Sequence, residues 1–158
     1  MDVNVEILLV ENNASDKTLA LHAFNKQDVA NNIHVVRDGT EALEYVFRTG
    51  AYAERTSENP KLMLLNLHLP LLDGFEVLRR IRAQRRTQTI PVVILTRSSE
   101  ERDIAESYRL GANSYIVMPP DFPQFLQVAQ QLASYWLQLN RPATSGDESS
   151  FEDRPGSA

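Results

Sequence analysis

The stretch LLNLHLPLLDG, residues Leu64–Gly74, combines the end of a short apolar run with an abrupt turn. Two leucines precede Asn66, and the turn contains Pro70, Asp73 and Gly74, each of which favours a tight turn for its own backbone reason. A strand that ends in this way presents the next side chain at the edge of a sheet. The pattern therefore predicts a functional position at Asn66, where the side chain is an amide.

Short apolar runs alternate with segments of helical periodicity along the whole chain. The runs are Glu6–Val10, Ile33–Val36, Leu62–Leu65, Val92–Leu95 and Tyr115–Val117. This alternation predicts βαβ units and a parallel sheet. The stretches Ile7–Val10 and Val92–Leu95 are continuously apolar, which is typical of central strands covered on both faces. In a doubly wound sheet of this kind, ligands bind beyond the carboxyl ends of the strands.

Five helices are predicted between and after these runs. Apolar residues at helical spacing indicate the first four within residues 14–25, 40–49, 75–81 and 104–110, and Gly111 is expected to end the fourth. The fifth carries one apolar stripe, made of Phe125, Val128, Ala129, Leu132, Trp136 and Leu139. Tyr135 and Leu137 fall off this stripe, which indicates either a contact surface or local packing.

The composition indicates one globular domain. With 158 residues and 42% hydrophobic content, the chain can bury one core of ordinary size. We expect residues 1–139 to form this domain and residues 140–158, rich in Pro, Gly, Ser and acids, to form a disordered tail. The polar segment Gly50–Lys61 is predicted to be an exposed insertion. The absence of cysteine excludes disulfides, thiolate metal ligands and a cysteine nucleophile.

Charge and hydropathy limit the classes of partner. The net charge of -5 argues against binding nucleic acid over the whole surface. The run RRIRAQRR, residues 79–86, is predicted to be a solvated helix face, because no aromatic residue interleaves it. No apolar run approaches the roughly 18 to 20 residues of a membrane-spanning helix, and the N-terminus lacks a signal-peptide pattern. We expect a cytoplasmic protein without membrane contact.

Four motifs, ILLVENN, LLNLHLPLLDGFEVLRRIR, IPVVILTRSS and GANSYIVMPPD, together resemble the receiver domain of two-component response regulators. The resemblance covers about Val5 to Leu139. The segment before the third run and the ending SYWLQL further resemble the single-domain regulators that partner bacterial and cyanobacterial phytochromes. The resemblance implies a flavodoxin-like doubly wound α/β fold: a five-stranded parallel sheet of order 2-1-3-4-5 with five helices.

The resemblance also assigns a degenerate phosphoacceptor and metal site. In the family, an aspartate after the third strand accepts a phosphoryl group from a sensor kinase, and carboxylates after the first strand help to hold Mg²⁺. By position, the acceptor is Asn66, and the metal ligands are Glu11, Asn12, Asn66 and the backbone carbonyl of His68. An amide oxygen is a poor nucleophile, and Mg²⁺ prefers one or two carboxylates. We therefore expect no cofactor, or only weakly bound Mg²⁺.

The remaining family positions concern the switch that follows phosphorylation. Thr96 corresponds to the hydroxyl after the fourth strand, Tyr115 to the aromatic residue of the fifth, and Met118 to the lost lysine. Thr96 and Tyr115 have plainer interpretations, a turn cap and a packing residue. The thioether of Met118 can fill space but offers no ammonium group to a phosphoryl oxygen.

The resulting prediction is a pseudo-receiver: a non-enzymatic response regulator that acts by phosphorylation-independent protein binding or dimerisation. The implied partners are a sensor histidine kinase or another signalling protein, a phytochrome among the candidates, or a second copy through the fourth helix, fifth strand and fifth helix. Two alternatives stay open. One is a working phosphoacceptor at Glu11, Asp73, His68 or a deamidated Asn66, and the other is a sensor of a small ligand or anion.

Overall fold

A five-stranded parallel sheet lies at the centre of the computed structural model, which describes residues 5–26 and 32–143. The strands, in the order β2-β1-β3-β4-β5, are β1 (Ile7–Val10), β2 (Ile33–Val36), β3 (Leu62–Leu65), β4 (Val92–Thr96) and β5 (Ser114–Val117). The helices are α1 (Ala14–Asn25), α2 (Gly39–Phe47), α3 (Gly74–Ala83), α4 (Glu101–Arg109) and α5 (Phe122–Leu132). The predicted flavodoxin-like fold is confirmed.

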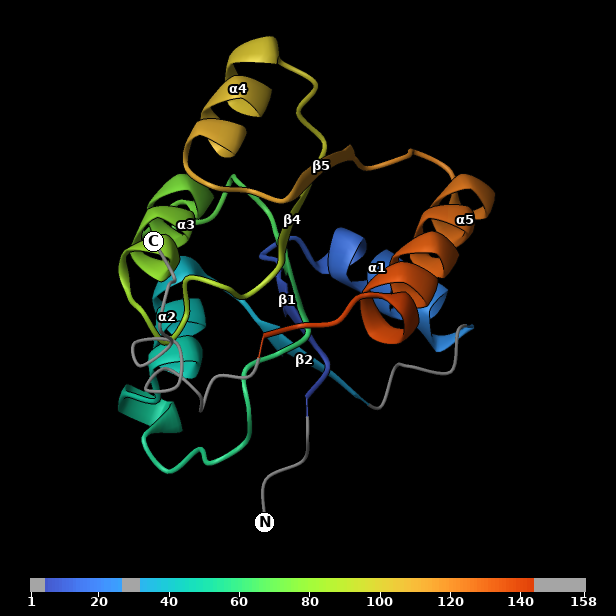
Figure 1. The fold of residues 1–158 in the computed structure, drawn as a ribbon. Helices are drawn as coiled ribbons and strands as arrows, with labels where there is room; N and C mark the ends of the chain where they lie inside the picture. Colours follow the sequence, from blue (N-terminus) through green and yellow to red (C-terminus); the bar gives the residue numbers. More distant parts are fainter. Residues whose placement is uncertain (1–4, 27–31, 144–158) are drawn as a thin grey trace, which may run out of the picture.

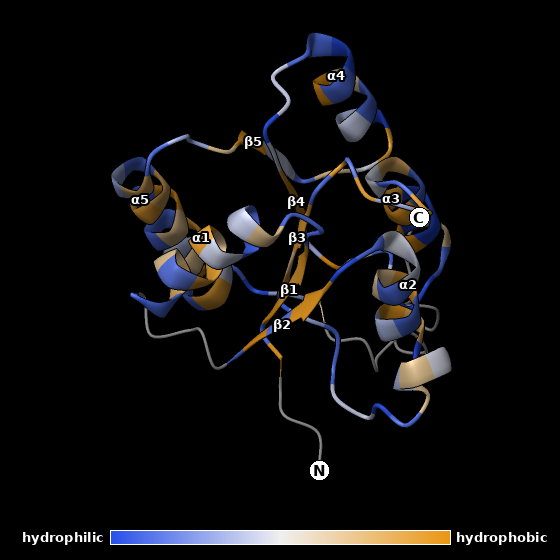
Figure 2. Ribbon diagram, turned by 180° about the vertical axis from the view of Figure 1, so that it is seen from behind, coloured by the Kyte–Doolittle hydropathy of each residue, from blue (hydrophilic) through white to orange (hydrophobic). Residues whose placement is uncertain are grey.

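The helices form two layers around the sheet, with α1 and α5 on one face and α2, α3 and α4 on the other (Figure 1). Successive residues of the central strands enter opposite cores, as the two-residue period of a strand requires. In β1, Ile7 and Leu9 join the core under α1 and α5, whereas Leu8 and Val10 join the core under α2 and α3. The strands are accordingly apolar along their length (Figure 2).

Polar side chains begin four of the helices. Asn13, Asp38, Asp73 and Asp121 each accept a hydrogen bond from a backbone N–H in the first turn of the helix that follows. Such caps satisfy donors that have no partner inside the helix. The backbone role predicted for Asp73 is confirmed by its bond from Glu76 N, at 3.0 Å.

Gly111 follows α4 and adopts a φ of +106°, which a residue with a side chain rarely takes. A Cβ there would also lie 3.0 Å from the side chain of Arg82. The predicted end of the fourth helix is confirmed.

The last helix differs from the single stripe predicted for it. After α5, residues Ala133–Leu139 form a π-helix, η3. A π-helix has more residues per turn than an α-helix, so the apolar residues of η3 no longer continue the apolar stripe of α5. Leu139, predicted to be in the core, is 70% exposed, whereas Leu137 packs against the core. Tyr135 is exposed as expected. The placement of Leu139 in the apolar stripe was therefore wrong, because the prediction assumed a constant helical period, whereas Leu137 has the local packing role that was left open for it.

The segment between α2 and β3 is less exposed than predicted. It contains a short helix, η2 (Gly50–Tyr52), and the buried residue Arg55. The Arg55 Nε donates to the carbonyl of Tyr45 at 2.9 Å, and the guanidinium lies 4.3 Å from the centre of the Tyr45 ring. The segment is thus partly built around an arginine that packs on α2.

The arginine run of α3 is also not wholly a solvated face. Arg79 and Arg80 pair with Glu76 on the outside of the helix. Arg82 is partly buried and donates to the carbonyls of Gly111 and Ile90, at 2.9 and 2.7 Å. Burial lowers the pKa of its guanidinium below the usual value. Arg82 therefore joins α3 to the loops before β4 and β5.

Two further expectations concern the tail and membrane-spanning helices. Of the predicted tail, residues 140–143 have no regular secondary structure, and residues 144–158 lie outside the described part of the chain. Within the described residues, no helix is long and apolar enough to cross a membrane.

Candidate functional site

The order of the strands brings the candidate residues to one edge of the sheet. In this strand order, β2 lies on one side of β1, and β3, β4 and β5 lie on the other. Doubly wound folds bind ligands at such a switch in strand order, which here falls between β1 and β3. Val10 and Leu65 are paired in register, so Glu11 and Asn66 leave the two strands side by side. The Asn66 N–H donates to the carbonyl of Val10 at 3.2 Å, which continues the ladder one residue further.

A cavity of about 260 Å³ lies at this edge. Its lining residues are Glu11, Asn12, Asn13, Asp16, Asn66, His68, Thr96 and Arg97. Five of them were predicted from the sequence as site residues and are brought together from the ends of three strands. Two other predicted residues, Tyr115 and Met118, do not line the cavity. Three lining residues, Asn13, Asp16 and Arg97, were not predicted.

Asn66 is hydrogen-bonded to Glu11 through its amide nitrogen. Its Nδ2 donates to Glu11 Oε2 at 2.6 Å, and its Oδ1 accepts from the His68 N–H at 3.2 Å. The opposite orientation would set the amide oxygen against a carboxylate and the NH₂ group against an N–H, so these partners fix which atom faces which. The Asn66 side chain thus turns a donor, and not a nucleophilic oxygen, toward the acidic residue.

The Glu11 carboxylate is buried, with only 4% of the residue exposed. Burial raises its pKa above the usual value of 4.5, while the bonds from Asn66 and from the backbone of Asn13 and Asn12 oppose that rise. All three of these donors point at Oε2, from Asn66 at 2.6 Å, Asn12 N at 3.0 Å and Asn13 N at 3.4 Å. Glu11 is therefore held by neutral hydrogen-bond donors.

These residues form a poor site for Mg²⁺. Glu11 is the only carboxylate among the three side-chain positions that the family resemblance assigns to the metal, and one of its oxygens already accepts three hydrogen bonds. Mg²⁺ demands octahedral oxygen ligands and gains most from charged ones. Within the described residues, no group of three or more His, Cys, Asp or Glu side chains is placed to hold a metal. The donor set agrees with the prediction of weak binding at most.

Thr96 and Tyr115 both contact the loop after β4. The Thr96 Oγ1 is buried and accepts a long hydrogen bond from the Ser98 N–H, at 3.4 Å. The Tyr115 hydroxyl donates to the Ser98 carbonyl at 2.9 Å, and the Ser98 Oγ donates to Asp103 in α4 at 2.7 Å. The turn-cap role considered for Thr96 is thus present, and Tyr115 does more than pack, because it holds this loop against β5.

An ion pair that the sequence analysis missed joins the same loop to α1. The Arg97 guanidinium donates to Asp16 Oδ1 from Nη2 at 2.7 Å and from Nε at 3.2 Å. Asp16 is buried, and the hydrogen bonds to its carboxylate raise the pKa of the Arg97 guanidinium. The only signal in the sequence is an arginine directly after a strand and an acid in the first turn of a helix. Nothing in the sequence gave a reason to pair two residues that are 81 positions apart.

Met118 lies in the core and not in the cavity. It is 4% exposed and packs with the residues under α1 and α5, while its backbone N–H donates to the Thr96 carbonyl at 2.7 Å. The thioether thus fills space in the apolar core, and Met118 is not among the residues that line the cavity. An unbranched thioether packs well in an apolar core. The cavity beside Thr96 is lined instead by Arg97.

The comparisons with known proteins agree with this architecture. Residues 7–130 match the family described as the response regulator receiver domain. The chain is 37% identical over 135 residues to the probable methanogenesis regulatory protein FilR2 of Methanothrix harundinacea, covering 85% of each chain. It is 34% identical over 132 residues to response regulator Rcp1 of Synechocystis sp., covering 84% of this chain and 88% of Rcp1.

Solved structures give the same result. The phosphorylated cyanobacterial phytochrome response regulator RcpA matches with a TM-score of 0.80 and 36% identity, over 89% of this chain and 99% of RcpA. The Mn²⁺-bound form of Rcp1 matches with a TM-score of 0.78 and 33% identity, over 87% of this chain and 97% of Rcp1. The chain is thus a homologue of phytochrome response regulators, and it belongs to the response regulator receiver domain family.

Proposed function

We propose that this protein is an atypical receiver, a pseudo-receiver, that acts in two-component signalling by binding another protein without being phosphorylated. The observation that carries the proposal is the hydrogen bond from Asn66 Nδ2 to Glu11 Oε2, at 2.6 Å. The amide nitrogen occupies the side of Asn66 that faces the acidic residue, so no charged oxygen is directed there to attack phosphorus or to bind a cation. Divalent metal binding is then weak.

Contacts within the chain support a fixed conformation of the loop after β4. Arg97 ties the loop to Asp16 of α1, and Tyr115 ties it to β5. Both contacts form between the protein's own side chains. A conformation held in this way requires no phosphoryl group, and a partner can still shift it by binding one arrangement more tightly than another.

The surface of α4, β5 and the last helix supports dimerisation as part of this function. Its exposed large apolar residues are Tyr108 (49%), Val117 (41%), Tyr135 (50%) and Leu139 (70%). β5 is also an edge strand of the sheet. Exposed apolar side chains and an unpaired strand edge each favour association.

The partner we propose is a sensor histidine kinase of a phytochrome system. RcpA is by its name a phytochrome response regulator, whereas FilR2 is named for methanogenesis, so the relatives differ in the signal they serve. The features favouring phytochrome signalling are the high coverage of RcpA and Rcp1 and the Trp136-containing end of the chain.

The alternative functions find less support at the site. Asp73 is engaged as the cap of α3, and Glu11 Oε2 accepts three hydrogen bonds, so neither is a free nucleophile. Arg97, the cation that could attract an anion, is already paired with Asp16. His68 is exposed at the rim of the cavity and stays the residue to examine if phosphate is found.

The decisive experiment is intact mass spectrometry after incubation with acetyl phosphate and Mg²⁺. The native chain is compared with the double variant Asn12→Asp, Asn66→Asp, which restores two carboxylates without burying a new charge at Met118. The proposal expects an unmodified native chain and a phosphorylated variant. Stable addition of phosphate to the native chain overturns it.

Association is tested separately by sedimentation velocity. The proposal expects a dimer that is weakened at least about tenfold when Tyr135 and Leu139 are both replaced by serine, because two of the four exposed large apolar side chains of this surface are lost. Replacement of the exposed Leu71, on the loop after β3, is the matched control. Equal effects of the two changes would contradict the proposed interface.

A further inference from the structure

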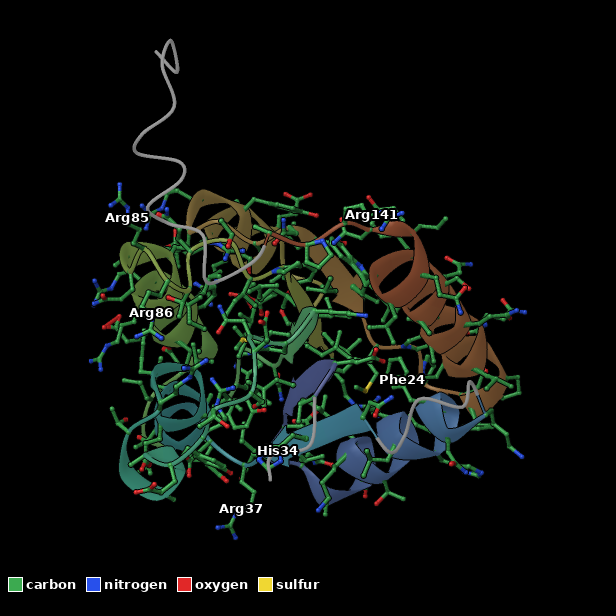
Figure 3. The ribbon with its side chains drawn as sticks, turned by 60° about the horizontal axis from the view of Figure 1, so that its bottom comes forward. Phe24, His34, Arg37, Arg85, Arg86 and Arg141 are labelled. Atoms are coloured by element: carbon green, nitrogen blue, oxygen red, sulfur yellow. The ribbon has the colours of Figure 1, made fainter. Side chains whose placement is uncertain are left out.

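Two hydrogen bonds in series connect His34 of β2, Tyr52 of η2 and Glu41 of α2. The His34 Nε2 lies 2.8 Å from the Tyr52 hydroxyl oxygen, and this hydroxyl donates to Glu41 Oε2, also at 2.8 Å. β2 is an edge strand of the sheet. Figure 3 shows His34 at this edge, and Arg37, which follows the strand, pointing away from the protein. The short helix η2 is thus tied to the edge of the sheet through one histidine.

Three aromatic rings pack together around these hydrogen bonds. The ring of His34 is stacked on the ring of Tyr45, with centres 4.8 Å apart and planes inclined by 19°. The ring of Tyr52 meets both of them edge-on, at 5.4 Å from His34 and 5.0 Å from Tyr45. All three rings line a cavity of about 280 Å³, which also includes Ala51. Tyr52 is therefore the side chain through which η2 contacts His34.

The partners of the Tyr52 hydroxyl fix the tautomer of His34. A carboxylate only accepts hydrogen bonds, so the single hydroxyl proton of Tyr52 points at Glu41. Burial and this bond raise the pKa of Tyr52, which keeps the proton on the hydroxyl. The Tyr52 oxygen therefore accepts from His34, and the neutral imidazole carries its proton on Nε2. A second proton can be added only at Nδ1.

Titratable groups face His34 from two elements, whereas its neighbour on β1 is the apolar Leu8. The groups of α2 are Glu41 and Tyr45, and those of η2 and the residues after it are Tyr52, Glu54 and Arg55. Of these, Glu41 favours an imidazolium and Arg55 disfavours it. Glu41 is also engaged by Arg37, whose backbone N–H donates to Oε1 at 3.0 Å and whose Nε lies 3.8 Å from the same atom.

The surroundings of His34 disfavour the second proton. The Arg55 guanidinium lies 4.3 Å from the centre of the Tyr45 ring on which His34 stacks, so an imidazolium there would share one ring with another cation. Burial is the largest cause, and together with Arg55 it lowers the pKa of His34 below the usual value of 6.5. The packed arrangement of the three rings therefore holds His34 neutral.

We propose that the contact between His34 and Tyr52 is a pH-sensitive latch, and that protonation of His34 releases η2 from β2. Because the closed arrangement holds the imidazole neutral, a fall in pH shifts the balance toward an arrangement in which water solvates the imidazolium. The closed arrangement is fully favoured above about pH 6.5 and is lost as the pH falls through the lower folded pKa.

The movement is confined to η2. The Arg55 Nε donates to the carbonyl of Tyr45 whatever the charge on His34, so the residues after η2 stay on α2. Release of η2 exposes the ring of Tyr52 and widens the cavity beside the edge strand. The latch lies outside the cavity that contains Asn66, and it does not depend on the chemistry of that residue.

An NMR titration of the full chain tests the latch. We expect the imidazole resonances of His34 to titrate below pH 6.5, and the NOEs between the His34 and Tyr52 rings to fall at least about threefold with the same midpoint. NOEs between the Tyr45 ring and the Arg55 side chain should persist and serve as the internal reference. A His34 midpoint above pH 6.5, or ring NOEs that do not change with pH, overturns the proposal.

A histidine variant and a matched control show which imidazole is responsible. His34→Gln cannot take up a proton, although its side-chain amide can still donate to Tyr52. The backbone amide resonances of Ala51 and Tyr52 should move with pH in the native chain and lose most of this movement in His34→Gln. His22→Gln removes a ring that packs on Phe122 and should leave the movement in place. Equal loss in both variants, or full movement in His34→Gln, overturns the proposal.

Glu41→Gln tests the electrostatic direction. Removal of this carboxylate should lower the pKa of His34 further, so that η2 is released at a correspondingly lower pH. Glu54→Gln, at another acid that lines the cavity, is the matched control and should leave both midpoints unchanged. Release of η2 at an unchanged pH in Glu41→Gln, while the His34 midpoint moves, would mean that the imidazole does not control η2 and would overturn the proposal.

Discussion

Asn66 Nδ2 lies 2.6 Å from Glu11 Oε2, so an amide hydrogen bond links the two strand ends that a receiver domain uses for its chemistry. The two residues are 55 positions apart and meet because β1 and β3 are neighbours in register. The bond places a neutral donor against a buried carboxylate. An amide at position 66 offers neither a charged oxygen for a cation nor a strongly nucleophilic oxygen.

Replacing Asn66 by aspartate should make the protein depend on metal. Asn66→Asp sets a second carboxylate against Glu11, and we expect a loss of about 1–3 kcal/mol in the free energy of unfolding when no divalent cation is present. Mg²⁺ or Mn²⁺ should then raise the melting temperature of the variant, because a ligand stabilises the state that binds it. Differential scanning calorimetry with and without EDTA measures the effect.

The control for that experiment is Asn66→Leu, which also loses the bond to Glu11 but gains no metal ligand. Its melting temperature should not respond to the cation. A native chain that responded as strongly as Asn66→Asp would show that the present donor set already binds the metal well.

The buried Glu11 should give stability a specific dependence on pH. Its folded pKa is raised above 4.5, so its contribution to stability is complete below the unfolded pKa and is lost as the pH rises through the folded value. Glu11→Gln cannot ionise and should gain stability relative to the native chain as the pH rises from about 4.5 through the folded pKa of Glu11. Urea unfolding of both proteins at several pH values measures this difference. As a control, Glu58→Gln, at an exposed position, should not show the gain in stability expected for Glu11→Gln.

Asp16 and Arg97 should be energetically coupled. A double-mutant cycle with Asp16→Asn and Arg97→Gln should give a coupling of about 0.5–1 kcal/mol, a small value because the Arg97 side chain is half exposed and screened by water. Each single variant should also speed hydrogen exchange in residues 97–100. Strictly additive effects on stability, with unchanged exchange, would mean that the pair does not hold the loop.

Arg82 should matter far more to stability than its neighbours on the same helix. Arg82→Met removes the donors to the carbonyls of Gly111, Gln88 and Ile90, and we expect a cost of about 2–4 kcal/mol. Arg80→Met, on the outside of α3, should cost less than about 0.5 kcal/mol. Chemical denaturation of the two variants compares them, and similar costs would refute the structural role of Arg82.

Much of the fold follows from local pattern. Continuous apolar runs such as Val92–Leu95 specify buried strands, and an acid or amide before a helix, as at Asp73, specifies where the helix begins. These signals are carried by residues close together in sequence, so they can be read before the chain is folded. The local signal failed at Leu139 of η3, where a change of helical period leaves a residue of the expected core stripe exposed.

The sequence by itself also determined the identities at the candidate site: an amide at Asn66, one carboxylate at Glu11 and a thioether at Met118. Only the tertiary structure decided which atoms meet. The strand order sets Arg97 against Asp16 across 81 positions, and the demands of the core draw Met118 away from the crevice. Such contacts depend on the packing of the whole sheet and its helices, because side chains distant in sequence become neighbours only when every intervening element is in place.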